Sequence, residues 1–291
     1  MNMQVLEYFL TVAQEGNITR SAGLLHITQP TLSRQLKDLE TELGKKLLKR
    51  TNKSVSLTQD GMVFRETARE ILTLYRKAKS ENNWKDNLSG DIYIGAGETE
   101  SFRILAKFIQ EFHRLHPLVC FHILSETAER IGEDVDKGVL DFGFIMRSVA
   151  MEKYDFLAFS HKELWGVLVR KDHPLASKKF VTPQELINEP LILPENTIFR
   201  QELLQWLNDR ASIFATYSLV YNALRLLQEG PGVIVCLKDP AFTDTGYVFL
   251  PLLPEQTVSP LLIWKKKLAR SSAVECFLQF ICHTKNESPL L

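Results

Sequence analysis

The sequence of 291 residues is poor in cysteine, and this scarcity excludes several classes of small protein. No two of its four cysteines stand in a Cys-x-x-Cys pair, so the chain has neither a zinc-finger spacing nor a dense disulfide framework. His113 and His116 have no cysteine or carboxylate partner in the sequence pattern, so we expect a polar helix face there and no metal or other cofactor. The apolar surroundings of the cysteines predict reduced, buried thiols at Cys120, Cys236, Cys276 and Cys282.

A long apolar run is also missing, as is any low-complexity tract or internal repeat. No segment reaches the roughly 20 consecutive apolar residues that cross a bilayer as a helix. The stretch from Met1 to Val5 lacks the basic start and apolar core of a secretion signal. We therefore predict a cytoplasmic protein with no membrane partner, and the length allows two or three folded units.

The motifs of common enzymes are absent as well. The chain contains no Gly-x-Ser-x-Gly elbow, no His-Glu-x-x-His pair, no Walker loop and no dinucleotide-binding glycine pattern. The segment from Gly230 to Val233 resembles a phosphate loop only in its glycines, because no Lys-Ser or Lys-Thr pair follows and a strand pattern comes next. These absences predict that the protein is not an enzyme.

Net charge is zero, with 35 basic and 35 acidic side chains, which at first argues against a nucleic-acid partner. The charges are segregated, however. Residues 45–53 are rich in Lys and Arg, whereas residues 98–100 and 126–136 are acidic. A basic module balanced by an acidic one explains the zero sum and keeps nucleic acid among the expected partners.

Two helical patterns lie between Gly16 and Arg50, with a break of only a few residues between them. The first runs from about Thr19 to Leu25 after a capping residue near Asn17, and we expect it to turn Ala22, Leu24 and Leu25 inward. Thr28 caps the second, and Pro30 is tolerated in its first turn. Such a pair is typical of a helix-turn-helix, although a bare pattern also fits an ordinary helical hairpin with a solvated face.

The second helix of the pair has one apolar and one polar face. Its leucines at 32, 36, 39 and 43 recur at spacings of four and three, so they face the preceding helices, which include a first helix over residues 3–15. Gly44 ends it, and a basic segment leads into the short strand pattern 54–57, as in a wing that reaches phosphates. The predicted core is Leu6, Phe9, Leu25, Leu32, Leu36, Leu39, Leu43 and Leu47.

About the first sixty positions contain a dense, ordered set of motifs: Ala22, the run from Gln29 to Gln35, Leu39-Glu40, Glu42-Leu43-Gly44, Leu47, Arg50, Leu57-Thr58 and Gly61. In these residues the chain resembles the LysR-type transcriptional regulator family. Polar side chains on a helix in the major groove hydrogen-bond base edges, and basic ones contact phosphates. We expect the DNA-binding residues to be Gln29, Pro30, Thr31, Ser33, Arg34, Lys37, Arg50 and Lys53.

Residues 59–80 contain no proline and carry a heptad-like apolar seam at Phe64, Ala68, Ile71, Tyr75 and Ala78. Such a seam fits ordinary core as well as a coiled coil. The resembling family uses this helix for dimerisation, so we favour the coiled coil, followed by a polar hinge near residues 82–90. The predicted organisation is a winged helix-turn-helix domain at 1–58, a linker and dimerisation helix with hinge at 59–88, and an effector-binding domain at 89–291.

Beyond the hinge, strand and helix patterns alternate, which predicts an α/β architecture with mostly parallel sheets. The resemblance implies two subdomains of type II periplasmic-binding-protein kind, one of residues 91–160 with 266–291 and one of residues 161–265. The expected strands are 91–95, 119–124, 141–145, 164–170, 191–193, 233–236 and 261–264, and the expected helices are 101–116, 127–138, 183–187, 201–210, 221–229 and 272–282.

A small effector is expected in the cleft between these subdomains, beyond the carboxyl ends of the strands. The segment from Gly97 to Ser101 follows the first strand and opens a helix, whose N–H groups favour an anion, while Glu98 and Glu100 oppose that preference. The effector could therefore be cationic, zwitterionic or neutral. Each serine or threonine hydroxyl in this region could also cap a helix and make no contact with an effector. The predicted effector-binding residues are Thr99, Glu100, Ser101, Thr127, Arg147, Asn196 and Thr197.

We therefore predict a transcriptional regulator that binds DNA sequence-specifically under the control of a small effector. The implied partners are an imperfectly palindromic double-stranded operator, the effector, a second copy in a homodimer that pairs into a homotetramer, and RNA polymerase. The alternative is a cytoplasmic solute-binding or α/β enzyme domain fused to a helical adaptor. That alternative leaves the first sixty residues unexplained, and a DNA-binding assay discriminates between the two.

Overall fold

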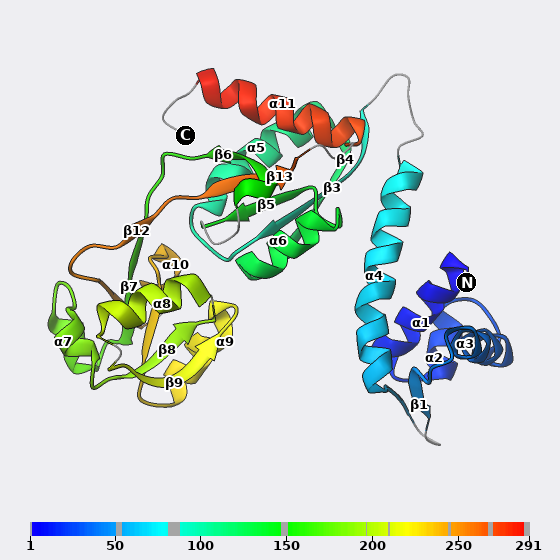
Figure 1. Ribbon diagram of the computed structural model, residues 1–291, viewed down its shortest axis with the longest axis horizontal. Helices are drawn as coiled ribbons and strands as arrows, with labels where there is room; N and C mark the ends of the chain where they lie inside the picture. The colour runs from blue at the N-terminus through cyan, green and yellow to red at the C-terminus, as the bar shows by residue number, and fades with distance from the viewer. Residues whose placement is uncertain are drawn as a thin grey trace. The chain divides into compact units, whose positions relative to one another are not determined.

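The computed structural model describes residues 2–50, 54–80, 88–146, 151–195, 197–208, 210–243, 246–266 and 270–287. The chain divides into two compact units, Met1–Asn82 and Asn83–Leu291. The first has a hydrophobic core of its own, and the second is built on two sheets with separate cores (Figure 1).

The first unit is a helical domain with a two-stranded wing, as the sequence predicts. Asn2, Asn17 and Thr28 each accept a backbone N–H at the start of a helix, and Gly44 ends the third helix at a φ of 64°. The elements are α1 (Met3–Glu15), α2 (Ile18–Leu24), α3 (Gln29–Leu43), β1 (Leu48–Arg50), β2 (Val55–Leu57) and α4 (Gln59–Ser80).

The core of this unit matches most of the prediction. Leu25 and Leu43 are partly buried against the core, whereas Leu24 is 56% exposed and does not turn inward. The prediction for Leu24 was wrong because α2 has only seven residues and contacts its neighbours through Ser21 and Ala22, leaving Leu24 on the opposite side. Fully buried are Leu6, Phe9, Leu32, Leu36, Leu39 and Leu47.

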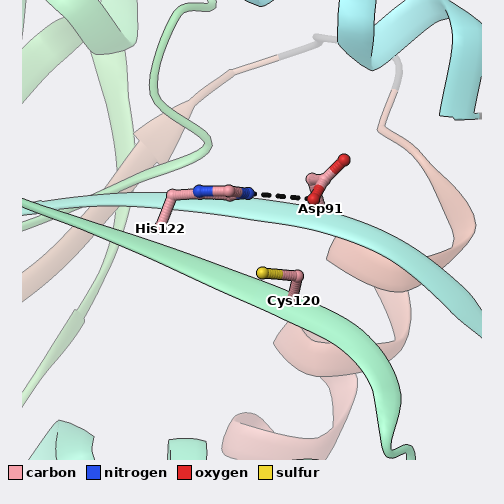
Figure 2. A group of neighbouring side chains, drawn as sticks. All are labelled: Asp91, Cys120 and His122. Atoms are coloured by element: carbon pink, nitrogen blue, oxygen red, sulfur yellow. Dashed lines mark hydrogen bonds and ion pairs between the residues drawn. The ribbon is translucent and has the colours of Figure 1, made fainter.

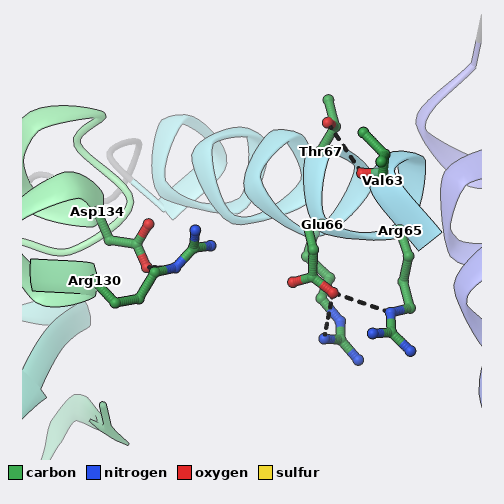
Figure 3. Close-up of polar contacts among 7 residues, drawn as sticks. Val63, Arg65, Glu66, Thr67, Arg130 and Asp134 are labelled. Carbon is green, nitrogen blue, oxygen red and sulfur yellow. Dashed lines mark hydrogen bonds and ion pairs between the residues drawn. The ribbon is translucent and has the colours of Figure 1, made fainter. Parts of the chain in front are cut away.

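The seam of α4 packs in large part within its own domain. Ala68 is buried in the core of the first unit, with Phe64 and Ile71 partly buried against it. Tyr75 is 45% exposed, and the side chain of Ala78 lies outside the described part of the chain. On an exposed stretch of the helix, Glu66 pairs with Arg65 at 3.0 Å and with Arg69 at 3.4 Å (Figure 3). The heptad-like seam is therefore partly intramolecular core.

The second unit begins with a five-stranded sheet in the order β4-β3-β5-β13-β6. Apolar side chains of α5 and α11 pack on one face of this sheet, and those of α6 on the other. The strands are β3 (Ser89–Ala96), β4 (Leu118–Ser125), β5 (Phe142–Ile145), β6 (Tyr154–Ala158) and β13 (Leu261–Lys265), and the helices are α5 (Phe102–Leu115), α6 (Ala128–Asp136), η1 (Met151–Lys153) and α11 (Ser272–Glu287).

A second sheet has the order β11-β7-β10-β8-β9, with β12 paired to β7. The helices η2, α7 and α8 lie among the residues between β7 and β9, and α9 and α10 flank β10 in sequence. The strands are β7 (Glu163–Arg170), β8 (Pro190–Pro194), β9 (Ser212–Tyr217), β10 (Val233–Leu237), β11 (Tyr247–Pro251) and β12 (Thr257–Val258), and the helices are η2 (Pro174–Ser177), α7 (Pro183–Leu186), α8 (Thr197–Trp206), α9 (Val220–Glu229) and α10 (Pro240–Thr243).

Both sheets are mixed, which corrects the expectation of mostly parallel sheets. Strands β3, β4 and β5 are parallel, as are β8, β9 and β10, whereas β6, β7, β11, β12 and β13 pair antiparallel. Strand β13 belongs to the first sheet, so the chain returns to that sheet before Leu261 rather than near residue 266.

The chain passes twice between the two sheets. In one passage β6 leads into β7, and in the other β12 leads into β13 (Figure 1). These passages are hydrogen-bonded to each other, since Phe159 N–H donates to the carbonyl of Pro260 at 3.1 Å and β12 pairs with the start of β7. We call residues 154–164 and 257–265 the connecting ribbon.

Candidate nucleic-acid interface and effector cleft

Helix α3 has a buried apolar face and an exposed polar face, as a helix that contacts base edges in DNA requires. Leu32, Leu36 and Leu39 are buried, and the opposite side carries polar side chains in solvent. Arg34 has 84% of its side chain exposed and lies 3.9 Å from Asp38, too far for a strong hydrogen bond. Gln29, Pro30, Thr31 and Lys37 are also exposed, and Ser33 is half-buried.

The cap of α3 occupies part of the predicted DNA-binding set. Thr28 Oγ1 accepts the backbone N–H of Thr31 at 3.4 Å, and the two threonine hydroxyls lie 2.8 Å apart. Thr31 therefore helps to begin the helix in addition to presenting a hydroxyl at the exposed face. The capping signal is local in sequence, which is why the start of this helix was predictable.

The wing is attached by a buried carboxylate. Glu40 is 6% exposed, and its Oε1 accepts the N–H groups of Leu47 at 2.8 Å and Leu48 at 3.1 Å. Val55 N–H donates to the carbonyl of Gly16 at 2.7 Å, which ties the second wing strand to the end of α1. These bonds hold β1 beside α3, which carries the polar face, and β2 beside the end of α1.

Basic side chains lie around the wing. Lys45 pairs with Asp60 at 3.0 Å, Lys46 lies 3.5 Å from Glu40, and Lys49 is exposed. The side chain of Arg50 and the whole of Lys53 lie outside the described residues, so these predicted phosphate contacts are not placed.

The two units carry opposite net charge. Residues 1–82 have 13 Lys and Arg against 9 Asp and Glu, a formal charge of +4. Residues 83–291 have 22 against 26, a formal charge of −4. The segregation of charge expected from the sequence therefore coincides with the division into units, and the basic one contains the polar face of α3.

The second unit contains a cleft of about 760 Å³ whose lining comes from both sheets. Residues that follow β3, β4 and β5 line one side, and residues of β7, β8, β9, β10 and β12 or their ends line the other. The parallel strands present their carboxyl ends to this cleft, as expected for a ligand site in open α/β sheets. Its volume is suited to a small molecule.

Three of the predicted effector residues line this cleft: Thr99, Glu100 and Thr127. Thr127 also accepts the N–H of Arg130 at 3.4 Å and so caps α6, while Glu100 pairs with Arg103 at 2.6 Å. Ser101 is 1% exposed and lies behind the lining rather than on it. Arg147, Asn196 and the side chain of Thr197 lie outside the described residues.

Sequence reasoning missed the most unusual lining residue, Glu163 at the start of β7. It is 3% exposed, and its Oε1 accepts the N–H of Ser101 at 2.6 Å. The contact joins residues 62 apart in sequence, between the first residue of a strand in one sheet and the start of α5 beside the other. The residues around Glu163 give no local signal of this contact.

On α6, Arg130 lies 3.3 Å from Asp134 (Figure 3). Inside the cleft, Tyr217 donates its hydroxyl to the carbonyl of Val235 at 2.8 Å, and burial raises the pKa of this phenol well above its usual value. Burial, with a smaller effect of Asp239, raises the pKa of Cys236 to about 12. Both groups are therefore neutral lining at physiological pH.

The cysteines differ in exposure. Cys236 is buried, and Cys276 and Cys282 are half-buried, in keeping with the expectation of reduced thiols in apolar surroundings. Cys120 is exposed, which corrects that expectation, because it lies on β4 at the edge of the first sheet. Among the helices that the structure describes, none combines the length and apolar character that crossing a bilayer requires.

Two protein families match this chain. Residues 3–62 match the family described as "Bacterial regulatory helix-turn-helix protein, lysR family", and residues 85–284 match the "LysR substrate binding domain". The matches cover the unit with the polar helix and the unit with the cleft.

Two bacterial regulators are similar to this chain in sequence. The Hca operon transcriptional activator HcaR of Escherichia coli K12 is 32% identical over 279 residues, covering 91% of this chain and 92% of HcaR. The uncharacterized regulator YnfL of the same organism is 33% identical over 199 residues, so the alignment spans 66% of each protein, just under two thirds of YnfL.

Solved structures agree on the fold. CbnR, a LysR family transcriptional regulator, is 20% identical and superposes with a TM-score of 0.73 over 98% of this chain and 99% of its own. Its complex with target DNA gives a TM-score of 0.70 at 21% identity, over 98% and 100% of the two chains. The family is not enzymatic, so the enzyme alternative falls away. The chain belongs to the LysR family of bacterial transcriptional regulators, with a DNA-binding helix-turn-helix domain and an effector-binding α/β domain.

Proposed function

We propose that this regulator binds an imperfectly palindromic operator as a homodimer. We further propose that a small effector in the cleft modulates operator binding or promoter activation. The observation that carries the operator proposal is the exposed polar face of α3, opposite a buried apolar face. In the major groove, Gln29, Thr31, Ser33 and Arg34 would meet base edges, with Pro30 in the same first turn. Lys37, Arg50 and Lys53 are proposed to contact phosphates.

The homodimer proposal rests on the surface of α4. Met62 is 56% exposed, Val63 67%, Leu74 42% and Tyr75 45%, all on one helix. Apolar side chains of this size stabilise a protein when they leave water, and pairing two α4 helices removes them from it. We extend the proposal to a dimer of dimers in the cytoplasm, with RNA polymerase as a further partner at the promoter.

DNA binding by a relative adds weight to this proposal. CbnR is described in complex with its target DNA, and its whole length aligns with this chain. The effector proposal rests on the cleft of about 760 Å³, with Thr99, Glu100 and Thr127 on its wall and Ser101 directly behind. Arg147, Asn196 and Thr197 stay in the proposed effector set as neighbours in sequence of that lining.

The operator proposal is tested with Arg34→Ala. A bound fragment is first recovered with the natural protein by genome-wide mapping of bound DNA, and retention of that fragment is then measured by gel shift. We expect Arg34→Ala to abolish specific retention while size-exclusion chromatography still shows a dimer, because the side chain is exposed and makes no core contact. Arg114→Ala, an exposed arginine of the second unit, is the control. Unchanged retention by Arg34→Ala would sink the assignment.

A further inference from the structure

Glu163 is a buried carboxylate, and among the described residues only one of its two oxygens has a hydrogen-bond partner. Its Oε1 accepts the N–H of Ser101, whereas Oε2 has no hydrogen-bond partner among the described residues. The residue is 3% exposed and lines the cleft. A buried carboxylate that lacks a full set of partners is costly, so a group that completes its shell gains binding free energy.

The same contact changes what the start of α5 can bind. A helix start after a strand favours an anion because its N–H groups are unsatisfied. Here the N–H of Ser101 already donates to Glu163. A carboxylate effector at this point would lie against a second carboxylate, and two like charges in a shared site repel each other. The cleft therefore disfavours an anion where the fold would otherwise attract one.

The charged residues in the rest of the described lining are, like Glu163, mostly negative. Lys238 is its one basic residue, and seven of its residues are acidic. Glu100 has Arg103 as a partner, so part of this charge is compensated. The acidic residues are Glu98, Glu100, Glu126, Glu163, Glu195, Glu202 and Asp239.

Apolar and aromatic side chains complete the wall beside Glu163. Trp165 follows two residues later on β7, and Phe144 and Phe242 also line the cleft. Aromatic faces attract cations and pack against apolar bodies. Thr99 Oγ1 is buried without a hydrogen-bond partner in the described structure, and a hydroxyl can accept from an N–H donor.

We propose that the effector is an organic cation, a primary amine or guanidine on an apolar or aromatic body, whose N–H groups donate to Glu163 Oε2. This inference rests on the proposed effector role of the cleft and names the chemical class that the cleft selects. The cation supplies the partner that Oε2 lacks, and the apolar body contacts Trp165 and its neighbours.

The test uses matched probes on the full chain. Phenethylamine and putrescine are the cationic probes, and 3-phenylpropionate is the anionic counterpart of phenethylamine. Binding is measured by isothermal calorimetry and by the shift of the thermal unfolding midpoint. Glu163→Gln retains an acceptor for Ser101 N–H but loses the charge, and Glu111→Gln, an exposed position on α5, is the matched control.

We expect an amine probe to bind the natural chain and Glu111→Gln, and to bind Glu163→Gln at least about thirtyfold more weakly, as for loss of one partner in a buried charge pair. Binding of 3-phenylpropionate without either amine overturns the inference, as does amine binding that Glu163→Gln leaves unchanged or the absence of any amine binding. Operator retention is measured on the same samples without probe. Retention that persists when the amines fail assigns the failure to this inference and not to the operator proposal.

A separate cluster lies on β3 and β4, away from the lining of the cleft. Asp91 and Cys120 are direct partners across the parallel pair, and His122 lies two residues along β4 on the same face (Figure 2). One donor atom from each lies within 4.8 Å of the other two. His122 Nε2 is 2.9 Å from Asp91 Oδ1, and its ring stacks on Tyr93 with centroids 4.4 Å apart.

This donor set is one that divalent zinc prefers. Zinc takes thiolate sulfur at about 2.3 Å, imidazole nitrogen at about 2.0–2.1 Å and carboxylate oxygen at about 2.0–2.2 Å, in tetrahedral geometry. Cys120 is exposed, and its Sγ lies within 4.8 Å of the donor atoms of the pair that His122 and Asp91 already form. The stacked Tyr93 restrains the imidazole, and the edge position of β4 leaves room for water as a fourth ligand.

We infer that Asp91, Cys120 and His122 form a surface site for a divalent transition metal of the zinc type. On binding, the Cys120 thiol releases its proton to solvent and the thiolate bonds to the metal, so no oxidant or reductant is needed. The charges of thiolate and carboxylate then balance that of the ion.

The metal site is tested by titrating the reduced full chain with Co²⁺ and then with Zn²⁺. We expect one Co²⁺ per chain, a thiolate-to-cobalt charge-transfer absorption, and its loss when Zn²⁺ displaces the cobalt. Cys120→Ser should abolish the band, and Asp91→Asn and His122→Gln should weaken binding at least about tenfold. His161→Gln and Cys282→Ser, outside the cluster, should leave the titration unchanged. A natural chain without the band, or a band that survives Cys120→Ser, overturns the assignment.

Discussion

Gly61 shows how one missing side chain fits the wing to α4. A Cβ at this position would overlap the carbonyl oxygen of Leu47. Because that oxygen belongs to the backbone, it cannot easily move away. Gly61 N–H also donates to Thr58 Oγ1 at 2.9 Å, so the helix start is held at this point. The close approach accounts for a glycine in the first turn of a helix that otherwise carries larger side chains.

We predict that Gly61→Ala lowers the free energy of unfolding of the first unit by about 1–3 kcal/mol, as overpacking does. Gly23→Ala is the matched control, because within the described residues a Cβ at this position would meet no atom within 4 Å beyond its chain neighbours and the backbone of its own helix. Since alanine is a better helix former, that control should gain about 0.5–1 kcal/mol. Denaturant unfolding followed by circular dichroism measures both, and equal stability of the two variants would contradict the account.

The cysteines allow a second prediction at this scale. The pKa of Cys236 is raised to about 12, chiefly by burial, and burial also raises the pKa of Cys276 and Cys282. Because the thiolate is the reactive form, iodoacetamide at pH 8 should modify exposed Cys120 first and leave Cys236 unmodified in the folded chain. Peptide mass spectrometry after a short exposure checks the order, and early labelling of Cys236 would show that its burial is wrong.

At the scale of elements, the attachment of the wing through Glu40 is the sharpest test of the first unit. Two backbone N–H groups depend on its carboxylate, whereas its partner Lys46 has 76% of its side chain exposed. We expect Glu40→Ala to cost about 2–4 kcal/mol of unfolding free energy, because buried donors lose their acceptor. Lys46→Ala should cost less than about 1 kcal/mol, as exposed ion pairs do. Comparable losses in thermal unfolding would mean that the ion pair, and not the hydrogen bonds, holds the wing.

Some elements were predictable because their signals are local. Thr28 with Pro30 and Gly44 bracket α3, and the structure places the helix between them. The strands that were not predicted include β6, β9 and β11, each at the edge of its sheet. Edge strands bury fewer side chains, as the largely exposed Ser212–Tyr217 shows, so their apolar pattern is weak. The antiparallel pairing of β6 and β11, together with that of β7, β12 and β13, is why the prediction of mostly parallel sheets failed.

Some residues of the candidate cleft were likewise predictable from local signals, and others were not. Thr99 and Thr127 were predicted because each follows a strand whose carboxyl end points to the cleft. Glu163 was not, since its role depends on a hydrogen bond to Ser101 across 62 residues. Asp91, Cys120 and His122 likewise come together only through the register of β3 with β4, which spacing along the chain does not reveal.

For the whole molecule, the opposite charges of the two units bear on binding to DNA. Phosphate contacts release counterions, so affinity falls steeply as salt rises, whatever the net charge of the full chain. We predict that raising salt from 50 to 200 mM weakens operator binding by about a thousandfold if the paired domains neutralise about six phosphates. Fluorescence anisotropy at a series of salt concentrations gives the slope. Lys37→Ala should lower that slope, and an affinity that does not change with salt would contradict a phosphate-based grip.

The connecting ribbon sets the mechanics of the second unit. Its two antiparallel passages are hydrogen-bonded to each other, so the two sheets cannot slide past one another without breaking that ladder. Opening or closing the cleft must instead bend and twist the connecting ribbon about a single axis. Glu163 lies in the connecting ribbon, where it is the antiparallel partner of Val258. A molecule that alters the bonding of Glu163 thus acts at the pivot itself, where a small rotation produces the largest displacement at the far ends of the two sheets.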